Sequence, residues 1–154
     1  MIKVGSLAPL TVQLKDQNDR PVSLQQHLGK PVILYFYPKD ETPGCTTEAC
    51  SFRDVFSEIT ATGAVVIGVS ADSTSSHQKF KLKHQLPFDL WSDPDHQLLA
   101  EFGVWQQKNF MGKLIMGIVR STFVIDKKGY VQAVWPKVNP QTHAAEILQF
   151  LKSI

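Results

Sequence analysis

The two cysteines of this 154-residue sequence, Cys45 and Cys50, are its most chemically suggestive residues. Cys45 follows a strand-like apolar run and a loop rich in proline and glycine, and it stands where a helix is predicted to begin. The first turn of a helix offers unpaired N–H groups and the positive end of the helix dipole, and both stabilise a thiolate. The position therefore favours a nucleophilic thiol at Cys45, with a small buried apolar residue as the alternative.

The spacing of the two cysteines limits what they can do together. On a regular helix, five residues span about 7.5 Å of rise and about 140° of rotation. That separation exceeds the roughly 7 Å between Cα atoms that a disulfide allows. A redox pair made of Cys45 and Cys50 therefore predicts a conformational change in which the first helical turns unwind.

A zinc site is another use of paired cysteines. Such a site needs a second cysteine pair, or histidines at ligand spacing. The sequence has no further cysteine, and its histidines show no such spacing. We therefore expect no metal. The histidines are His27, His77, His84, His96 and His143.

Composition narrows the class of protein. Hydrophobic residues make up 43% and charged residues 19%, which is enough for one packed core. The formal charge of +2 gives no reason to expect a nucleic-acid or membrane surface. The apolar runs are far shorter than the roughly 18 residues of a spanning helix, and we see no signal peptide. With only two cysteines, we expect one cytoplasmic domain over residues 1–154.

Hydrophobic patterning predicts the elements that position the cysteines. Strands alternate with helices, which indicates an α/β domain with a mixed central sheet flanked by helices and extended by an N-terminal β-hairpin. The segment around Phe110–Gly112 is interpreted as a solvated loop. The predicted elements are a hairpin of Leu10–Leu14 and Pro21–Leu24, a strand at Val32–Tyr37, a loop from Pro38 to Gly44, a helix from about Thr46 to Ala61, a strand at Ala64–Ser70, a helix from Ser73 to about Gln85, a short helix from Asp93 to Gly103, strands at Thr122–Ile125 and Tyr130–Trp135, and a helix from Gln141 to Leu151.

Two segments carry a resemblance to a known family. Residues 38–45 read Pro-Lys-Asp-Glu-Thr-Pro-Gly-Cys, which reproduces the Pro-x-x-x-Thr-x-x-Cys active-site motif of the peroxiredoxins. The longer string from Tyr35 to Cys50 resembles the bacterioferritin comigratory protein, or peroxiredoxin Q, subgroup. Residues 120–126 resemble the segment that carries that family's active-site arginine.

The resemblance implies a thioredoxin-like fold and a thiol-dependent peroxidase that uses no metal, haem or flavin. Its substrates would be hydrogen peroxide and organic hydroperoxides. Cys45 would be the peroxidatic cysteine and Cys50 the resolving one, because no third cysteine exists. The resulting disulfide would be recycled by thioredoxin or a glutaredoxin-type reductant. We expect a monomer, with a dimer as the alternative.

The resemblance also assigns roles to four residues around Cys45. Thr42 would hydrogen-bond the thiolate and the bound peroxide, and Arg120 would stabilise the thiolate and polarise the substrate. Pro38 would shape and shield the pocket, and Glu48 would orient the arginine. Each has a structural alternative, since Thr42 could cap a turn, Arg120 could be a surface charge and Glu48 could be a helix-start acid.

Two other classes of function are compatible with reactive cysteines. One is a non-enzymatic redox sensor that passes its disulfide to a partner, and the other is a thioredoxin-fold binding module with inert cysteines. Neither needs a site that polarises a peroxide. Cleavage of an O–O bond needs a nucleophile and donors for the departing oxygen, which a thiolate, a hydroxyl and a guanidinium supply. The set of Thr42, Cys45 and Arg120 therefore favours catalysis.

Overall fold

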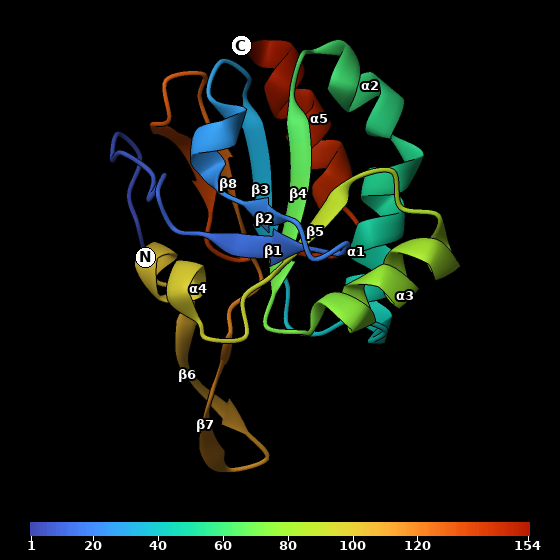
Figure 1. Ribbon diagram of the computed structural model, residues 1–154, viewed down its shortest axis with the longest axis vertical. Coiled ribbons are helices and arrows are strands. Elements are labelled where there is room, and N and C mark those ends of the chain that lie inside the picture. The colour runs from blue at the N-terminus through green and yellow to red at the C-terminus, as the bar shows by residue number, and fades with distance from the viewer.

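The computed structural model describes residues 1–154 and centres on a seven-stranded mixed sheet (Figure 1). The strand order is β2-β1-β5-β4-β3-β8-β9. The β3–β4 and β4–β5 pairs are parallel, and the β1–β2, β1–β5, β3–β8 and β8–β9 pairs are antiparallel. The predicted mixed α/β architecture is confirmed. The strands of this sheet are β1 (Leu14–Asp16), β2 (Pro21–Val22), β3 (Val32–Phe36), β4 (Val65–Ser70), β5 (Asp89–Ser92), β8 (Ser121–Ile125) and β9 (Val131–Trp135).

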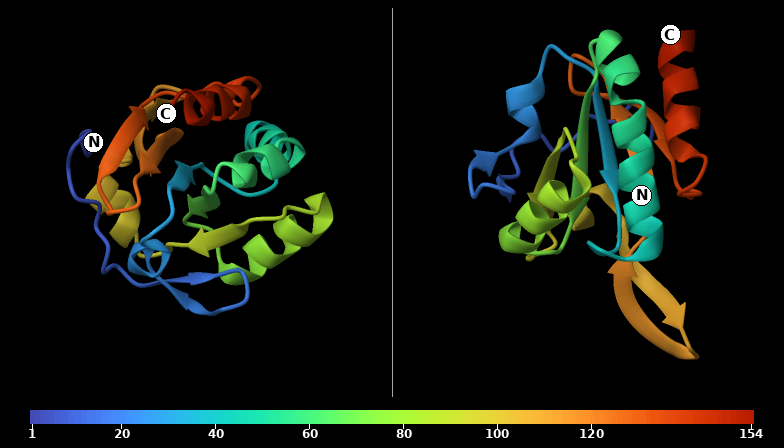
Figure 2. Two further views of the ribbon diagram at one scale, coloured as in Figure 1. Left: turned by 90° about the horizontal axis from the view of Figure 1, so that it is seen from above. Right: turned by 90° about the vertical axis from the view of Figure 1, so that its right-hand side faces the viewer.

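Helices cover both faces of this sheet (Figure 2). One face packs against α1, α3 and α5, with α2 continuing from α1, and α1 lies beside α5. The opposite face packs against the N-terminal segment, η1 and α4. The helical elements are η1 (Leu24–His27), α1 (Pro43–Asp54), α2 (Phe56–Ala61), α3 (Thr74–His84), α4 (Gln97–Phe102) and α5 (His143–Ser153).

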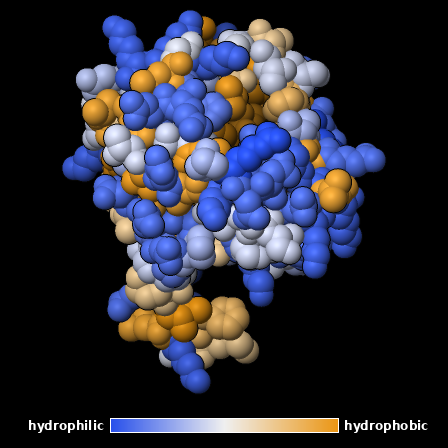
Figure 3. Space-filling model, in the orientation of Figure 1, coloured by the Kyte–Doolittle hydropathy of each residue, from blue (hydrophilic) through white to orange (hydrophobic).

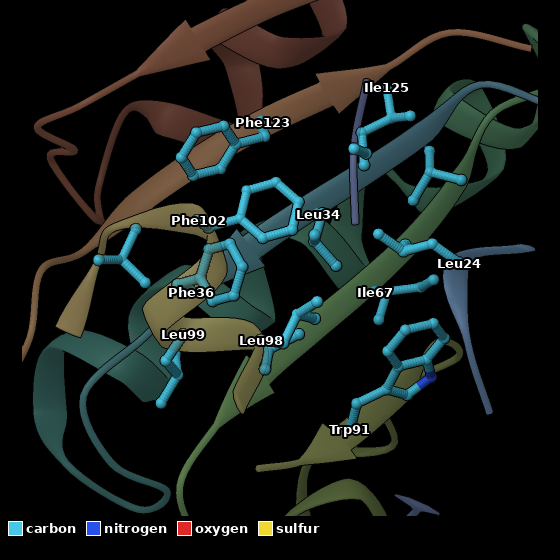
Figure 4. Packing of buried hydrophobic residues seen from close by; sticks show 14 of the residues in the cluster. Leu24, Leu34, Phe36, Ile67, Trp91, Leu98, Leu99, Phe102, Phe123 and Ile125 are labelled. Atoms are coloured by element: carbon cyan, nitrogen blue, oxygen red, sulfur yellow. The ribbon is translucent and has the colours of Figure 1, made fainter. Parts of the chain in front are cut away.

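Strand β3 divides the core into two halves because its side chains alternate across the sheet. Ile33 and Tyr35 belong to the cluster under α1 and α5, whereas Leu34 and Phe36 belong to the cluster on the other face. On that second face the ring of Phe102 lies 5.2 Å from Phe36 and 4.8 Å from Phe123, centroid to centroid (Figure 4). All five residues of β3 are buried, as the uninterrupted apolar run predicts.

The helix that carries the cysteines differs from the prediction at both ends. It begins at Pro43 rather than Thr46, because proline suits the first helical position, where no N–H partner is needed. The single predicted helix also breaks at Val55, whose φ of −112° and ψ of 12° leave the helical range. The remainder forms the separate helix α2. Both cysteines remain on α1.

Other predictions also need correction, among them the short helix predicted from Asp93, which begins only at Gln97. The N-terminal hairpin is present, but its first strand begins only at Leu14, so residues 10–13 lie outside it. The predicted loop around Phe110–Gly112 is the turn of a separate two-stranded sheet, β6 (Trp105–Phe110) and β7 (Lys113–Ile118). This β6–β7 hairpin projects from the body and presents apolar side chains to solvent (Figure 3). Strand β5 has no counterpart among the predicted elements.

None of the helices has the length and apolar composition needed to cross a membrane.

Candidate active site

Cys45 is the third residue of α1 and is 1% exposed. Thr42 precedes the helix in an extended conformation, and Pro43 occupies the first helical position. The carbonyl of Thr42 accepts the first helical hydrogen bond, from the Thr46 N–H at 2.9 Å. The sulfur therefore belongs to the first turn, where the N–H groups have no partner within the helix, as the sequence predicts.

Sheet register brings Arg120 to this helix from far along the chain. Strands β3 and β8 are antiparallel, with Ser121 opposite Phe36. Arg120, just before β8, therefore lies beside the end of β3, where the loop to α1 begins. Its Nη2 donates to the Cys45 sulfur at 3.3 Å, and its Nη1 donates to the Glu48 carboxylate at 2.8 Å. One guanidinium thus links two residues that are a single turn apart on α1.

Glu48 is fully buried, and only one of its carboxylate oxygens, Oε1, has a partner. Burial raises the pKa of Glu48 from an ordinary value of 4.5 to about 7, and the nearby Arg120 opposes this rise only in part. Burial also works against the charge of Arg120, but its charge interactions and hydrogen bonds with Cys45 and Glu48 together outweigh burial and raise the pKa of the guanidinium. The arginine therefore stays charged beside the sulfur.

Thr42 and Pro38 are less closely connected to Cys45 than the resemblance implies. The Thr42 hydroxyl donates to the carbonyl of Lys39 at 2.8 Å, and no hydrogen bond joins Thr42 to Cys45. The expected Thr42–thiolate hydrogen bond is therefore absent from this structure. Pro38 is exposed just after β3. Both residues lie on the short loop between β3 and α1. The hydrogen bonds of the site instead join Arg120 to the Cys45 sulfur and to Glu48.

Gly44 is a residue of the site that sequence reasoning missed. A Cβ atom at this position would lie 3.1 Å from Arg120 Nη2, which is tighter than an ordinary contact. The absence of a side chain therefore lets the guanidinium approach the first turn of α1. The Pro-Gly pair before Cys45 is the available signal in the sequence, and by itself it predicts only a loop.

Cys50 lies on the same helix in a different environment. Both cysteines are free thiols, but Cys50 is partly exposed whereas Cys45 is buried. Both lie on α1, so a disulfide between them would require this helix to unwind.

A second polar group lies outside the thiol site. Ligand atoms of Asp40, Asp72 and His77 lie within 4.8 Å of one another, an arrangement that could hold a metal ion. Histidine spacing along the sequence did not indicate it, because these residues come from three different segments. Each of the three side chains already has hydrogen-bond partners within the protein.

The thiol site can attack an electrophile and stabilise the charge that develops. A thiolate at Cys45 would be the nucleophile, and the guanidinium beside it can donate to an oxygen atom that takes up negative charge. This combination, on a sheet with helices on both faces, is what a thiol-dependent peroxidase with a thioredoxin-like fold requires.

Comparison with known proteins agrees with this class. The model of the AhpC/TSA family matches residues 4–134, so the chain belongs to that family. Peroxiredoxin Bcp of Bacillus subtilis is 50% identical over 153 residues, which cover 99% of this chain and 97% of that protein. The chloroplastic peroxiredoxin Q of Sedum lineare is 46% identical over 151 residues, covering 97% and 78%. The chain is thus a peroxiredoxin of the Bcp/Q group.

Solved structures give the same result. The bacterioferritin comigratory protein of Xanthomonas campestris, studied for its alkyl peroxide reduction activity, superimposes with a TM-score of 0.91 at 39% identity, covering 96% of each chain. A cysteine-to-serine mutant of Xylella fastidiosa PrxQ gives a TM-score of 0.94 at 33% identity, covering 99% of this chain and 97% of that one. The predicted thioredoxin-like peroxiredoxin fold is confirmed. Peroxiredoxins reduce peroxides with a cysteine thiol and are recycled by a reductant.

Proposed function

We propose that Cys45 is the peroxidatic nucleophile. Its thiolate attacks one peroxide oxygen, an S–O bond forms, the O–O bond breaks, and the second oxygen leaves as water or an alcohol after taking up a proton. Cys45 is oxidised to a sulfenic acid as the peroxide is reduced. The observation that carries this proposal is the Arg120 guanidinium, which donates to both the Cys45 sulfur and Glu48.

The other site residues have supporting roles in this proposal. Glu48 holds the guanidinium of Arg120 in place, and Arg120 also polarises the peroxide. Thr42 hydrogen-bonds the bound peroxide through its hydroxyl oxygen, and Pro38 shields one side of the pocket. The alkyl peroxide activity of the Xanthomonas relative supports extending the substrates of this chain from hydrogen peroxide to organic hydroperoxides.

We propose that Cys50 completes the cycle as the resolving cysteine, as in atypical two-cysteine peroxiredoxins. Its thiol condenses with the Cys45 sulfenic acid, an S–S bond forms, and water is released. Cys50 is the only other cysteine, and it lies on the same helix. The first turns of α1 must unwind to bring the two Cα atoms within about 7 Å. Thioredoxin or a glutaredoxin-type dithiol then reduces the exposed disulfide.

We further propose that the protein works as a monomer of one domain in the cytoplasm. An intramolecular Cys45–Cys50 disulfide needs no second subunit. Reducing compartments keep thiols free, which suits a cycle that must regenerate both cysteines.

Mass spectrometry on Cys50→Ser tests the proposed cycle. With one equivalent of hydrogen peroxide, the wild type should form an intramolecular disulfide. Cys50→Ser should react once and then accumulate sulfenic and sulfinic acid at Cys45, because no thiol traps the intermediate. Cys45→Ser is the matched control and should stay unmodified. Normal turnover of Cys50→Ser with thioredoxin would contradict the resolving role.

Hydrogen exchange tests the unwinding of α1. In the oxidised protein, amides of residues 45–52 should lose protection relative to the reduced form, while amides of α5 keep theirs. Equal protection of residues 45–52 in both redox states would contradict the proposed conformational change.

A further inference from the structure

The loop between β3 and α1 is anchored by a buried polar cluster that the proposed peroxidase cycle does not use. Asp40 of this loop is 5% exposed, and both of its carboxylate oxygens are occupied. Oδ1 accepts from the Tyr37 hydroxyl at 2.6 Å. Oδ2 accepts from the Ser76 hydroxyl at 2.8 Å and lies 2.7 Å from His77 Nδ1. The Asp40 N–H donates to Asp72 at 2.8 Å.

The contacts of His77 determine how many protons this cluster holds. Its Nε2 lies 3.0 Å from the carbonyl oxygen of Trp91, which can only accept, so Nε2 carries a proton. Its Nδ1 lies 2.7 Å from Asp40 Oδ2, and so short a contact requires a proton between the two atoms. The pair therefore holds one proton on the Nδ1–Oδ2 axis, either as imidazolium with carboxylate or as neutral imidazole with carboxylic acid.

Both forms of the pair have no net charge, which makes its burial possible. His77 is fully buried, and an unpaired carboxylate beside it would be costly to remove from water. The partners of Asp40 come from the end of β3, from α3 and from the segment after β4, and His77 extends the connection to β5. All of these contacts lie outside α1.

Between this anchor and Cys45 the backbone is strained. Glu41, which follows Asp40, has a φ of 63°, a left-handed conformation that non-glycine residues rarely adopt. Such a conformation persists only where its surroundings hold it. Thr42 follows, and α1 begins at Pro43. The position of Asp40 therefore determines where Thr42 and the first turn of α1 lie relative to Arg120.

We propose that Asp40 is a positioning residue for the peroxide reaction: clamped by His77, it fixes the loop that presents Thr42 and Cys45, and it stays fixed when α1 unwinds. The second part rests on the proposed Cys45–Cys50 cycle, whereas the first concerns only the reaction of reduced protein with peroxide. Stopped-flow measurement of that first reaction does not involve Cys50. Its result is therefore independent of whether the disulfide step is correct.

Two substitutions of Asp40 separate geometry from charge. In Asp40→Asn the amide oxygen can still accept from Tyr37, and the amide N–H can donate to Nδ1 of a neutral His77. Asp40→Ala leaves the Tyr37, Ser76 and His77 groups without their partner. We expect Asp40→Ala to lower the second-order rate with hydrogen peroxide about 10- to 100-fold, because small displacements of reacting groups cost that much. Asp40→Asn should stay within about threefold of wild type.

Controls keep this test decisive. Glu41→Gln removes the charge of the neighbouring exposed carboxylate, which forms ion pairs with Lys83 and His84, and replaces only the side chain, so it should leave the rate unchanged. If Asp40→Ala does not fold, Tyr37→Phe removes the hydroxyl that donates to Asp40 at 2.6 Å and lies 3.4 Å from His77 Nδ1, and it should lower the rate about two- to threefold. In the folded variants, the fraction of Cys45 that becomes sulfinic acid under excess peroxide should also fall, because a displaced site slows the second attack on peroxide as well as the first.

Three results would overturn the proposal. The first is a wild-type rate for folded Asp40→Ala or, where that variant does not fold, for Tyr37→Phe. The second is a loss in Asp40→Asn as large as that in Asp40→Ala, which would show that the negative charge acts rather than the clamp. The third is stoichiometric zinc or manganese, measured by elemental analysis after dialysis against each metal and abolished in Asp40→Asn, which would make Asp40, Asp72 and His77 a metal site instead.

Discussion

Cys45 and Cys50 are the same residue type on one helix, yet their surroundings differ. Cys45 is buried in the first turn, with the Arg120 guanidinium 3.3 Å from its sulfur. Cys50 is partly exposed, and no side-chain hydrogen bond reaches it. About 140° of helical rotation separates the two positions. The two thiols therefore differ in the partners that the sheet brings to them, and not in the residue itself.

The partners of Cys45 come from distant parts of the sequence. Arg120 is 75 residues away, and the antiparallel pairing of β3 and β8 places it at the site. Cys50 has no such counterpart, so its environment is that of an ordinary helix surface. Substitutions that remove the partners of Cys45 should therefore make its reactivity toward peroxide more like that of Cys50.

The largest loss of peroxide reduction should follow from replacement of Cys45 itself. Cys45→Ser keeps nearly the same volume but replaces a thiol that can ionise with a hydroxyl that stays protonated. We expect complete loss of peroxide reduction in a folded protein, measured in a coupled assay with thioredoxin. Cys50→Ser should instead keep its first reaction with peroxide. Appreciable turnover of folded Cys45→Ser would remove the distinction between the two thiols.

The next largest effect should follow from Arg120→Lys. Lysine keeps the positive charge but loses the planar fork that reaches both the Cys45 sulfur and Glu48. We expect the second-order rate with hydrogen peroxide to fall about 100-fold, the scale of removing one donor from a developing oxyanion. Stopped-flow fluorescence can measure this rate. Arg53→Lys, at the far end of α1, is the control, and an equal loss there would contradict a specific role for Arg120.

Glu48, a partner of Arg120 beside Cys45, should make the free energy of unfolding depend on pH. Its pKa rises from 4.5 to about 7 on burial, so between these values the folded protein binds more protons than the unfolded chain. The free energy of unfolding should therefore decrease as the pH rises from about 4.5 to 7, by at most about 3 kcal/mol, and stay level above that.

Glu48→Gln should remove this decrease. Burial lowers the pKa of His143, which acts in the opposite direction, because its contribution to stability is lost as the pH falls. The difference between wild type and Glu48→Gln cancels the His143 contribution. Urea unfolding at pH 5 and pH 8 measures it, with Glu58→Gln as an exposed control. An identical pH slope in wild type and Glu48→Gln would show that Glu48 does not titrate on unfolding.

Much of the fold could be predicted because burial leaves a pattern in the sequence. The central strands β3 and β4 read as apolar runs, and their predicted positions are confirmed within a residue or two. The β6–β7 hairpin could not be predicted in the same way. Phe110, Met111 and Leu114 are all exposed on it, so no alternation of apolar and polar residues marks its strands.

The site was predictable in its residue types but not in its contacts. The motif around Cys45 indicated a reactive thiol, and the resemblance named Arg120 and Glu48. The proximity of Asp40 and His77, which are 37 residues apart, depends on the docking of α3 against the loop after β3. No spacing rule within one element can reveal such a pair. The same is true of Gly44, whose importance lies in the approach of Arg120.

The smallest expected effect concerns Gly44. An added methyl group would lie 3.1 Å from Arg120 Nη2, so the guanidinium must shift by a few tenths of an ångström, whereas Pro140 at 3.6 Å is an ordinary neighbour. We expect Gly44→Ala to lower the rate with peroxide about two- to fivefold, because the donor moves away from the sulfur. Stopped-flow measurement at constant pH is sufficient to detect this change.

Gly44→Ala should also strengthen the helix that has to unwind. Alanine favours a helix over glycine by about 0.5–1 kcal/mol, so α1 should be more stable and disulfide formation with Cys50 slower. Thr47→Ala, at an exposed position of the same helix, raises helix propensity without contacting Arg120. It should slow the disulfide step but leave the reaction with peroxide unchanged. If Thr47→Ala lowers the peroxide rate as much as Gly44→Ala, helix stability rather than the position of Arg120 governs the reactivity of Cys45.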